Sequence, residues 1–492
     1  MKFVLCFILC IISTSYTSDI VINNKRFPTS FLFGAATSSY QIEGGWDADG
    51  KGQNIWDNVT HKNPNFIKDG TNADVSSDSY HRYKDDVQLL KDHGAQFYRF
   101  SIAWPRIMPN GFRNSLNQAG VQYYKNLIAE LKNNNIEPMI TIYHNDLPQA
   151  LQDLGGIKMP QFADWFAEYA RVCFELFGND VKHWMTINEP YVACTVGFIS
   201  LPYEDGVEDY ICIKNMLLAH ANAWHIYDKD FRPTQGGKVG MVLNSNWFEP
   251  ESDKPEDLEA SERSMQFIWG WLAHPLYKGD YPEIMKTRVA MRSQLEGYNQ
   301  SRLTELTSEE IAYIKGTNDF FCVNSYTTAI VRGQPEPPIG KPSHNTDLGV
   351  VMYQPADWQD SPLDWLKVCP WGIQKLLRWI ANEYGNPEMI ITENGYADGT
   401  GTLNDTIRYN YIKDYLSYIR DAMDKDGANV IGYGYWSLID NFEWTSGYTA
   451  KFGLAYIDFN DPERKRIRKM SSYYYEHVIK TRCLLEDNSC QD

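Results

Sequence analysis

Two glutamates stand at the ends of apolar segments in this chain. Glu393 closes the run PEMIITE (387–393), and Glu189 directly follows the run KHWMTIN (182–188). A buried strand does not usually finish on a single carboxylate, because an ionised acid loses its hydration there unless a partner compensates. Each glutamate is therefore a candidate for chemistry, and the question is whether the fold brings the two together.

Other side chains that can bind or react occur at the ends of similar runs. They are Arg99, His144, Asn188, Asn324, Tyr326 and Trp436. One polar residue at a strand end is usually a cap or a loop contact, and a single glutamate there is more often a structural ion-pair partner. Polar side chains at several strand ends are hard to explain by loop solvation alone. We therefore interpret Glu189 and Glu393 as a pair that works in one pocket.

Two carboxylates that face each other across a pocket are what glycoside hydrolysis needs. One attacks the anomeric carbon while the other protonates the departing oxygen, and the second then exchanges its role to activate water. The alternative is a pair of structural acids in salt bridges. Because Glu189 and Glu393 occur with the other strand-end residues, the sequence favours the catalytic interpretation.

Eight short apolar runs, separated by helix-like stretches, would position these residues. We predict strands at 30–36, 96–102, 137–143, 182–188, 238–244, 318–324, 387–393 and 429–437. Runs buried on both faces and separated by helices indicate a parallel sheet. Eight of them favour an α/β fold with a closed (β/α)8 TIM barrel, whose active site lies at the carboxyl ends of the strands.

The segments between the runs have the spacing of crossover helices. Residues 80–94 and 123–135 carry apolar side chains at helical intervals and end near Gly or Asn. The second candidate architecture is a doubly wound sheet. It would require a glycine-rich phosphate turn after the first strand, and GAATSSYQIEGG is not such a turn.

Composition limits the class of protein. The chain has 492 residues, 43% of them hydrophobic and 14% aromatic, with a formal net charge of −17. This charge repels nucleic acid and anionic membrane surfaces, so we expect neither as a partner. The aromatic residues serve either as core or as flat platforms for sugars. The sequence leaves open whether the protein is a monomer or a homodimer.

The first residues have the pattern of a secretory signal. A lysine precedes an apolar stretch from Phe3 to Ile12, and small polar residues follow. We expect cleavage near Ser18 and a soluble secreted protein, for example in a gut lumen. Because no linker is visible, we expect residues 19–492 to form a single catalytic domain. Three sequons, at Asn58, Asn299 and Asn404, agree with a secreted glycoprotein.

Seven cysteines remain after the signal, so at least one thiol is free, and we expect it to be buried. Cys194 could pair with Cys212, and Cys483 with Cys490. The cysteines lack the paired short spacing of a zinc site, and we expect neither a metal nor a cofactor.

The quoted segments resemble a known family. TINEP (186–190) and ITENG (391–395) are similar to the two catalytic signatures of glycoside hydrolase family 1, the β-glucosidases. Further segments with this similarity lie at 31–57, 98–109, 143–151, 324–328 and 435–459. The resemblance covers essentially the whole mature chain and is that of a secreted animal member, of arthropod type. It implies the same (β/α)8 barrel.

The resemblance implies a role for each acid. Glu189 would be the acid/base and Glu393 the nucleophile. Arg99 and Tyr326 would keep Glu393 ionised by charge and hydrogen bonding. Glu189, which faces a second carboxylate, would have a raised pKa and stay protonated until it is needed.

The resemblance also implies a set of sugar contacts. The glucose hydroxyls would be held by Gln41, His144, Asn188 and Glu443, with Asn188 at the 2-hydroxyl. Trp436 would lie under the sugar ring and Trp444 beside it. The site would be completed by Asn324 and Tyr326. Two positions depart from the family pattern. Asn145 stands where the family usually has Trp, which affects the choice of sugar, and Cys322 stands where a glycine is usual.

Three functions agree with these observations. The first is a retaining β-glucosidase that acts on small β-D-glucosides. The second is a myrosinase, which would cleave plant thioglucosides with the same two acids, and the third is a non-catalytic relative that binds sugars. A glucosinolate carries a sulfate, for which Arg292, Arg302 and Arg332 are available. We expect these arginines to be solvated at the surface instead.

Overall fold

The computed structural model describes residues 20–195 and 204–492. The predicted signal peptide, residues 1–18, lies outside the described residues. Among the helices of these two ranges, none combines the length and the apolar character that crossing a bilayer requires.

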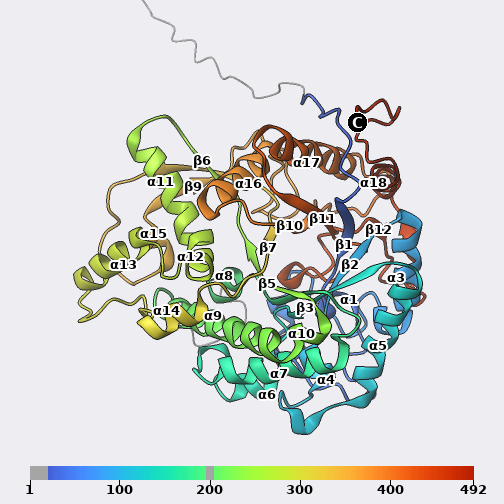
Figure 1. The fold of residues 1–492 in the computed structure, drawn as a ribbon, viewed down its shortest axis with the longest axis horizontal. Helices are drawn as coiled ribbons and strands as arrows, with labels where there is room; N and C mark the ends of the chain where they lie inside the picture. The colour runs from blue at the N-terminus through green and yellow to red at the C-terminus, as the bar shows by residue number, and fades with distance from the viewer. Residues whose placement is uncertain (1–19, 196–203) are drawn as a thin grey trace, which may run out of the picture.

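Eight parallel strands close into a barrel, in the order β1-β11-β10-β7-β5-β4-β3-β2. Their bounds are β1 Leu32–Ala36, β2 Phe97–Ser101, β3 Glu137–Tyr143, β4 His183–Asn188, β5 Lys238–Asn244, β7 Phe321–Asn324, β10 Met389–Asn394 and β11 Val430–Trp436. Figure 1 shows these strands in the middle of the molecule with helices around them. Each of the eight predicted runs forms one strand, so the barrel is confirmed and the doubly wound sheet is wrong.

Strand β7 is shorter than predicted, because it begins at Phe321 and not at residue 318. The side chains of Asn318 and Asp319 accept hydrogen bonds from the backbone N–H groups of Met241 and Val239, each at 2.7 Å. Polar side chains of this kind compete with the backbone ladder. Here these two side chains take the place of the first backbone hydrogen bonds between β5 and β7.

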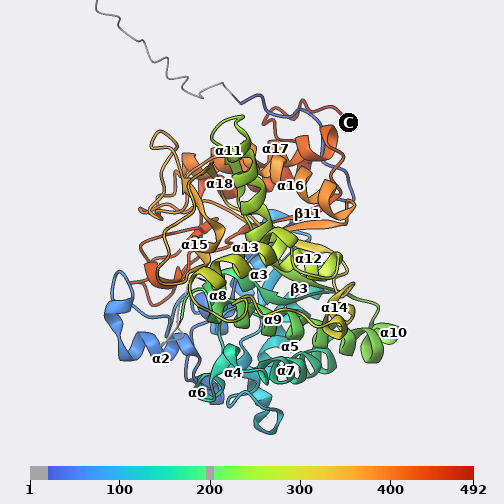
Figure 2. The same ribbon diagram turned by 90° about the vertical axis from the view of Figure 1, so that its left-hand side faces the viewer.

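Helices surround the barrel. The longer ones are α3 Ser79–His93, α5 Gln118–Asn133, α7 Phe162–Phe177, α9 Glu208–Ile226, α11 Pro255–Met265, α13 Glu283–Leu295, α16 Trp371–Tyr384, α17 Thr406–Lys425 and α18 Met470–Thr481. The shorter ones are α1 Ser39–Ile42, α2 Ile55–Lys62, α4 Trp104–Ile107, α6 Gln149–Asp153, α8 Pro190–Thr195, α10 Arg232–Gln235, α12 Trp271–Tyr277, α14 Ser308–Ile314 and α15 His344–Leu348. In Figures 1 and 2, α16 and α17 lie together on one side of the strands and α7 lies on the opposite side.

Both predicted crossover helices form. Helix α3 ends at His93, and the following Gly94 has the left-handed φ of 75° that favours glycine. Helix α5 begins five residues before the predicted start, because the side chain of Asn117 accepts a hydrogen bond from the N–H of Ala119 and caps the helix.

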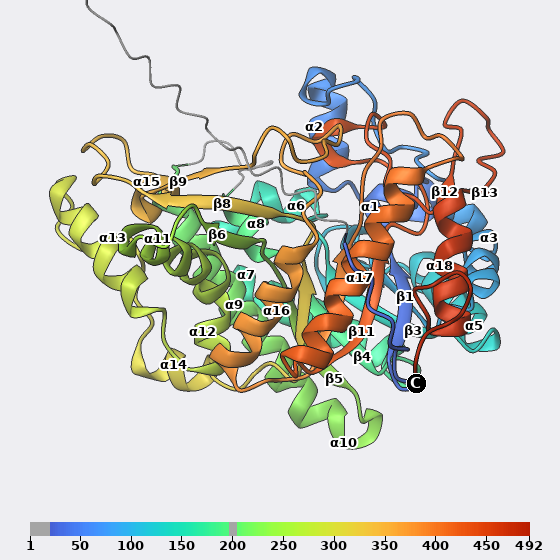
Figure 3. The same cartoon turned by 90° about the horizontal axis from the view of Figure 1, so that it is seen from above.

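Two small sheets outside the barrel were not predicted. One contains β6 Trp247–Pro250, β8 Thr328–Gly333 and β9 Val350–Tyr353, and the other pairs β12 Ala455–Tyr456 with β13 Ile467–Arg468. Figure 3 shows β6, β8 and β9 side by side at one edge of the molecule. These strands are partly exposed, so they do not appear as the continuous apolar runs from which the barrel strands were predicted.

Large side chains fill the barrel interior below the candidate site. This buried layer contains Phe97, Met139, Met185, Val242, Phe320, Cys322 and Ile390. Glycines make room for the Phe97 ring: a Cβ atom at Gly34 would lie 2.6 Å from Cδ2 of Phe97, and one at Gly434 would lie 3.3 Å from its Cε2. Because side chains alternate along a strand, Arg99 is the next residue of β2 on the same side as Phe97.

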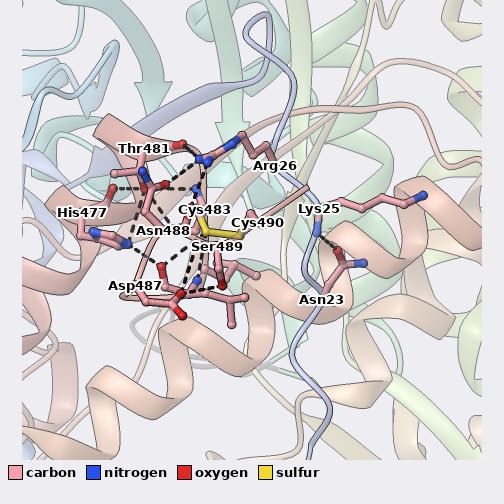
Figure 4. Close-up of a disulfide and its surroundings, with 12 residues drawn as sticks. Asn23, Lys25, Arg26, His477, Thr481, Cys483, Asp487, Asn488, Ser489 and Cys490 are labelled. Atoms are coloured by element: carbon pink, nitrogen blue, oxygen red, sulfur yellow. Dashed lines mark hydrogen bonds between the residues drawn. A yellow bond between two sulfur atoms is a disulfide. The ribbon is translucent and has the colours of Figure 1, made fainter. Parts of the chain in front are cut away.

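Two disulfides join segments of the chain, and both predicted pairings are confirmed. Cys194 pairs with Cys212, and Cys483 pairs with Cys490. Near the second bond, Arg26 donates to the carbonyl of Thr481 and to the side chain of Asn488, so the C-terminal loop is held against the N-terminal segment (Figure 4). The remaining cysteines of the described ranges, Cys173, Cys322 and Cys369, are free and buried.

We expect Phe97→Ala to destabilise the barrel by about 3–5 kcal/mol, because it removes a ring from a packed layer and leaves a cavity. Chemical denaturation of the protein measures the change. Leu154→Ala serves as a control, since Leu154 is 53% exposed, and it should change stability by less than about 0.5 kcal/mol. A Phe97→Ala loss no larger than that of the control would contradict the packed layer.

Candidate active site

The predicted site residues lie at one end of the barrel. Asn188, Asn324 and Trp436 are the last residues of β4, β7 and β11, and Glu393 is the last but one of β10. His144 follows β3 and Glu189 follows β4. In a parallel barrel all carboxyl ends meet at one face, so the structure brings these residues together.

Arg99 connects one acid to the neighbouring strands. Its guanidinium is fully buried and forms a salt bridge with Glu393. It also donates to Oγ1 of Thr141 at 2.9 Å and to Oδ1 of Asn188 at 2.7 Å. A buried cation is stable only where it is paired and hydrogen bonded, and these three partners satisfy Arg99.

Asn324 extends this network to the other acid. Its Nδ2 donates to Oε1 of Glu189 at 2.6 Å and to Oδ1 of Asn188 at 3.3 Å. Its own Oδ1 accepts from Thr392 at 2.7 Å, which fixes the orientation of the amide. A continuous chain of contacts therefore runs from Glu189 through the two amides and the guanidinium to Glu393.

Both carboxylate oxygens of Glu393 have a partner. One oxygen receives the Arg99 guanidinium, and the other accepts a hydrogen bond of 2.7 Å from the hydroxyl of Tyr326. Burial and the charge of Glu393 raise the pKa of Tyr326 well above its usual value, so the phenol keeps its proton and remains a donor. Hydrogen bonds and positive charge stabilise the charged form of an acid.

The environment of Glu189 favours the neutral form. Burial, followed by the negative charge of Glu393, raises the pKa of Glu189 to about 8. Its φ of 45° lies in the left-handed region, and its N–H donates to the carbonyl of Val242 at 3.0 Å. A carboxyl with a raised pKa thus lies in one pocket with a carboxylate that is paired with a cation, which is the arrangement of an acid beside a nucleophile.

Gln41 and Glu443 form a second polar group. Nε2 of Gln41 donates to Oε2 of Glu443 at 3.2 Å and to Oδ1 of Asn441 at 3.2 Å, while its Oε1 accepts from Ser38 at 2.6 Å. Burial, followed by the charge of Glu393, raises the pKa of Glu443 to about 8. Both side chains can thus present fixed donors and acceptors to a hydroxylated ligand.

Three rings lie nearly parallel beside these groups. The His144 ring is 5.8 Å from Trp436 at 19° and 6.0 Å from Trp444 at 17°. Burial and the nearby charge of Arg99 lower the pKa of His144 well below its usual value, so this ring is neutral. Asn188 donates to its Nε2 at 3.2 Å, which leaves the proton on Nδ1. Rings with polar atoms at their edges suit a sugar.

Some contributors were missed from the sequence. Ser38, Thr141 and Asn441 orient the side chains that reach the pocket, yet a serine, a mid-strand threonine and a loop asparagine give no pattern of their own. Asn145 follows His144 with a φ of 59° and is half-buried. Cys322 is fully buried in the interior layer.

The prediction for two of the three arginines was wrong. Arg292 and Arg302 are buried, not solvated, because acidic side chains pair with them. Glu296 forms a salt bridge of 3.1 Å with Arg292 and one of 2.8 Å with Arg302. Asp347 forms a further salt bridge of 2.6 Å with Arg302. Arg332 is exposed, as expected.

The described ranges contain no group of three or more His, Cys, Asp or Glu side chains that could hold a metal ion. Of the three sequons, Asn299 and Asn404 are exposed, and Asn58 is half-buried on α2.

Comparison with known proteins gives consistent matches. The family described as Glycosyl hydrolase family 1 matches residues 23–483. The chain is 46% identical over 463 residues to Myrosinase 1 of Brevicoryne brassicae, covering 93% of this chain and 99% of that protein. It is 43% identical over 461 residues to lactase/phlorizin hydrolase of Rattus norvegicus, covering 92% of this chain but 24% of that longer protein.

Solved structures agree with these matches. An aphid myrosinase superposes with a TM-score of 0.87 at 46% identity, covering 92% of this chain and 99% of that one. A rice β-glucosidase mutant in a covalent complex with Glc superposes with a TM-score of 0.88 at 37% identity, covering 93% and 99%. Sequence and fold agree along nearly the whole described chain, so the chain belongs to glycosyl hydrolase family 1 and is a glycoside hydrolase.

Proposed function

We propose that this enzyme is a retaining β-glucosidase that cleaves small β-D-glucosides through a covalent glycosyl-enzyme intermediate. The observation that carries the proposal is the network of contacts from Glu189 to Glu393, in which the pKa of Glu189 is raised and Glu393 is paired with Arg99. Glu393 is the proposed nucleophile and Glu189 the proposed acid/base.

In the first step Glu393 attacks the anomeric carbon. The bond from that carbon to the aglycone oxygen breaks, and Glu189 gives its proton to the departing oxygen. Negative charge then leaves Glu393 as its ester forms, while Glu189 becomes the anion. Arg99, which bonds Glu393 before the attack, positions the carboxylate oxygen for it.

In the second step Glu189 acts as a base. It takes a proton from water, the water oxygen attacks the anomeric carbon, and Glu393 departs as a carboxylate. Tyr326 and Arg99 stabilise that carboxylate as its charge returns. The configuration at the anomeric carbon is retained after two displacements.

The glucose hydroxyls are the proposed ligands of the second polar group. Gln41 and Glu443 offer a donor and acceptors side by side, and Trp436 and Trp444 offer apolar faces. We assign Asn188 to the 2-hydroxyl, where hydrogen bonds strengthen in the transition state. A carboxyl at Glu443 favours a free sugar over a sugar phosphate, which needs cationic partners.

We also propose that residues 1–18 are a signal peptide and that the enzyme is secreted. The disulfides Cys194–Cys212 and Cys483–Cys490 support this, because such bonds persist mainly in oxidising compartments.

A thioglucosidase is the second candidate, and the 46% identity to an aphid myrosinase favours it. A glucosinolate needs a cation for its sulfate. Four cations in segments that connect the barrel strands are already paired: Lys51 with Asp57, Arg106 with Glu43, Lys158 with Glu208 and Lys367 with Asp360. Arg332, in β8, is exposed. Residues 190–213, directly after Glu189, contain no Lys or Arg. These observations favour O-glucosides with neutral aglycones.

The nucleophile can be identified by trapping. A 2-deoxy-2-fluoro glucoside with a good leaving group should label Glu393, and Glu393→Gln should lower kcat by about 10⁴-fold or more, the scale seen when a covalent nucleophile is removed. Peptide mapping and steady-state rates measure the two effects. Glu388→Gln is the control, because Glu388 precedes β10 at the opposite end of the same strand. A label on any other residue would contradict the assignment.

The rate should depend on pH through Glu189. Its pKa of about 8 means that it is protonated below that pH, so kcat/KM should fall as the pH rises through about 8. Glu189→Gln should remove this limb and slow alkyl glucosides by about 10²–10⁴-fold, while aryl glucosides with good leaving groups suffer less. Because the pKa of Glu443 is also raised to about 8, Glu443→Gln is the control and should keep the limb. Equal losses for both substrate classes would argue against an acid role.

The preference for an oxygen or a sulfur leaving group depends on the proton that Glu189 supplies. Sulfur leaves a glucosinolate as a stabilised anion and needs little protonation, whereas an alkoxide needs a proton from Glu189. We expect kcat/KM for aryl and alkyl β-glucosides to exceed that for a glucosinolate by at least about tenfold. Parallel assays under one set of conditions measure the ratio, and the opposite order would promote the thioglucosidase.

A further inference from the structure

The two exposed sequons lie among exposed apolar side chains. Beside Asn299, Leu295 is 54% exposed and Tyr298 is 36% exposed; beside Asn404, Leu403 is 46% exposed and Ile407 is 42% exposed. The half-buried sequon is different, since Ile55 and Trp56, which precede Asn58, are buried. Single apolar residues on a surface are ordinary. Both exposed sequons thus have exposed apolar side chains as neighbours in sequence, and the half-buried one does not.

The first of these groups is an apolar patch at the end of α13. Met291, one turn before Leu295, is 40% exposed and extends it along the helix. The guanidinium of Arg302 lies 5.7 Å from the centre of the Tyr298 ring. Arg302 therefore covers one side of the ring, and the exposed part remains next to Asn299.

The second patch precedes α17, and its backbone is fixed. Asp405 and Arg408 form a buried salt bridge, and the carbonyl of Leu403 accepts a hydrogen bond of 2.8 Å from the N–H of Met470. This anchoring orients the segment so that Leu403, Asn404 and Ile407 all face solvent. Neither patch contains a residue of the candidate active site, and α13 lies at the periphery of the molecule in Figures 1 and 3.

We propose that N-linked glycans at Asn299 and Asn404 cover these two apolar patches and keep the enzyme from aggregating. The proposal rests on secretion, which is part of the proposed function. The apolar faces of the first sugars would pack on Tyr298 and Leu295 at one site and on Leu403 and Ile407 at the other. Removing the apolar faces of the sugar and of these side chains from water lowers the free energy.

The modification transfers a group without redox change. The side-chain nitrogen of the asparagine forms a bond to the anomeric carbon of N-acetylglucosamine. The bond from that carbon to a phosphate oxygen breaks in the donor, a lipid-linked oligosaccharide diphosphate of the secretory pathway. The amide loses one proton to a base of the transferase.

Expression of the full chain in secreting insect cells tests the occupancy. Enzymatic deglycosylation of the secreted protein in H₂¹⁸O, followed by peptide mapping, should show Asn299 and Asn404 converted to labelled Asp in most molecules. A parallel preparation with a heterologous signal peptide keeps the test valid if residues 1–18 do not direct secretion. Secreted protein with either asparagine unmodified would overturn the proposal.

Aggregation tests the purpose of the glycans. Light scattering at a fixed protein concentration should show that Asn299→Gln with Asn404→Gln aggregates several-fold faster than the parent enzyme, while Asn58→Gln does not. Adding Leu295→Ser, Tyr298→Ser, Leu403→Ser and Ile407→Ser to the double variant should restore the parent rate. Unchanged aggregation of the double variant would overturn the covering role.

Activity separates this proposal from the proposed function. In the same preparations kcat/KM for an aryl β-glucoside should be the same with and without the two glycans, because the patches lie outside the site. Loss of glucosidase activity in the fully glycosylated parent would contradict the proposed function alone. Loss of glucosidase activity only in the unglycosylated variants would contradict the statement that the patches lie outside the active site.

Discussion

The buried salt bridge between Arg99 and Glu393 is the constraint on which the site depends. A guanidinium below the mouth of a barrel is stable only with partners on several sides, and these come from β3, β4 and β10. The same guanidinium pairs with Glu393 and orients Asn188. Because Asn188 also meets Asn324 and His144, one ion pair organises much of the pocket.

The negative charge of Glu393 affects the protonation of the two other glutamates in the pocket. The charge of Glu393 adds to burial in raising the pKa of Glu189 and Glu443 to about 8. A carboxyl with a raised pKa in the folded state binds its proton more tightly than in the unfolded chain. Its contribution to stability is therefore present below the unfolded value and is lost as the pH rises toward 8. Protonated Glu189 is needed for catalysis, so some stability at high pH is given up for function.

The rest of the barrel limits how this arrangement can move. The interior layer with Phe97 lies directly below Arg99, and glycines of β1 and β11 allow its ring to fit. Above it, the near-parallel rings of His144, Trp436 and Trp444 leave little freedom to the side chains that would meet the sugar. Asn145, which follows His144 along the chain, is half-buried and has a left-handed φ of 59°.

The sequence by itself determined the eight strands, the crossover helices and the strand-end residues, because these depend on local periodicity and on the position of a residue along a strand. Both disulfide pairings were among the possibilities that the sequence left open. Tertiary structure alone decided which distant side chains meet: Arg99 and Glu393 are 294 residues apart, and Arg302 and Asp347 are 45 residues apart. Small strands such as β9 and orienting residues such as Thr141 were missed for the same reason. Their role comes from neighbours that are distant in sequence, and no local pattern records them.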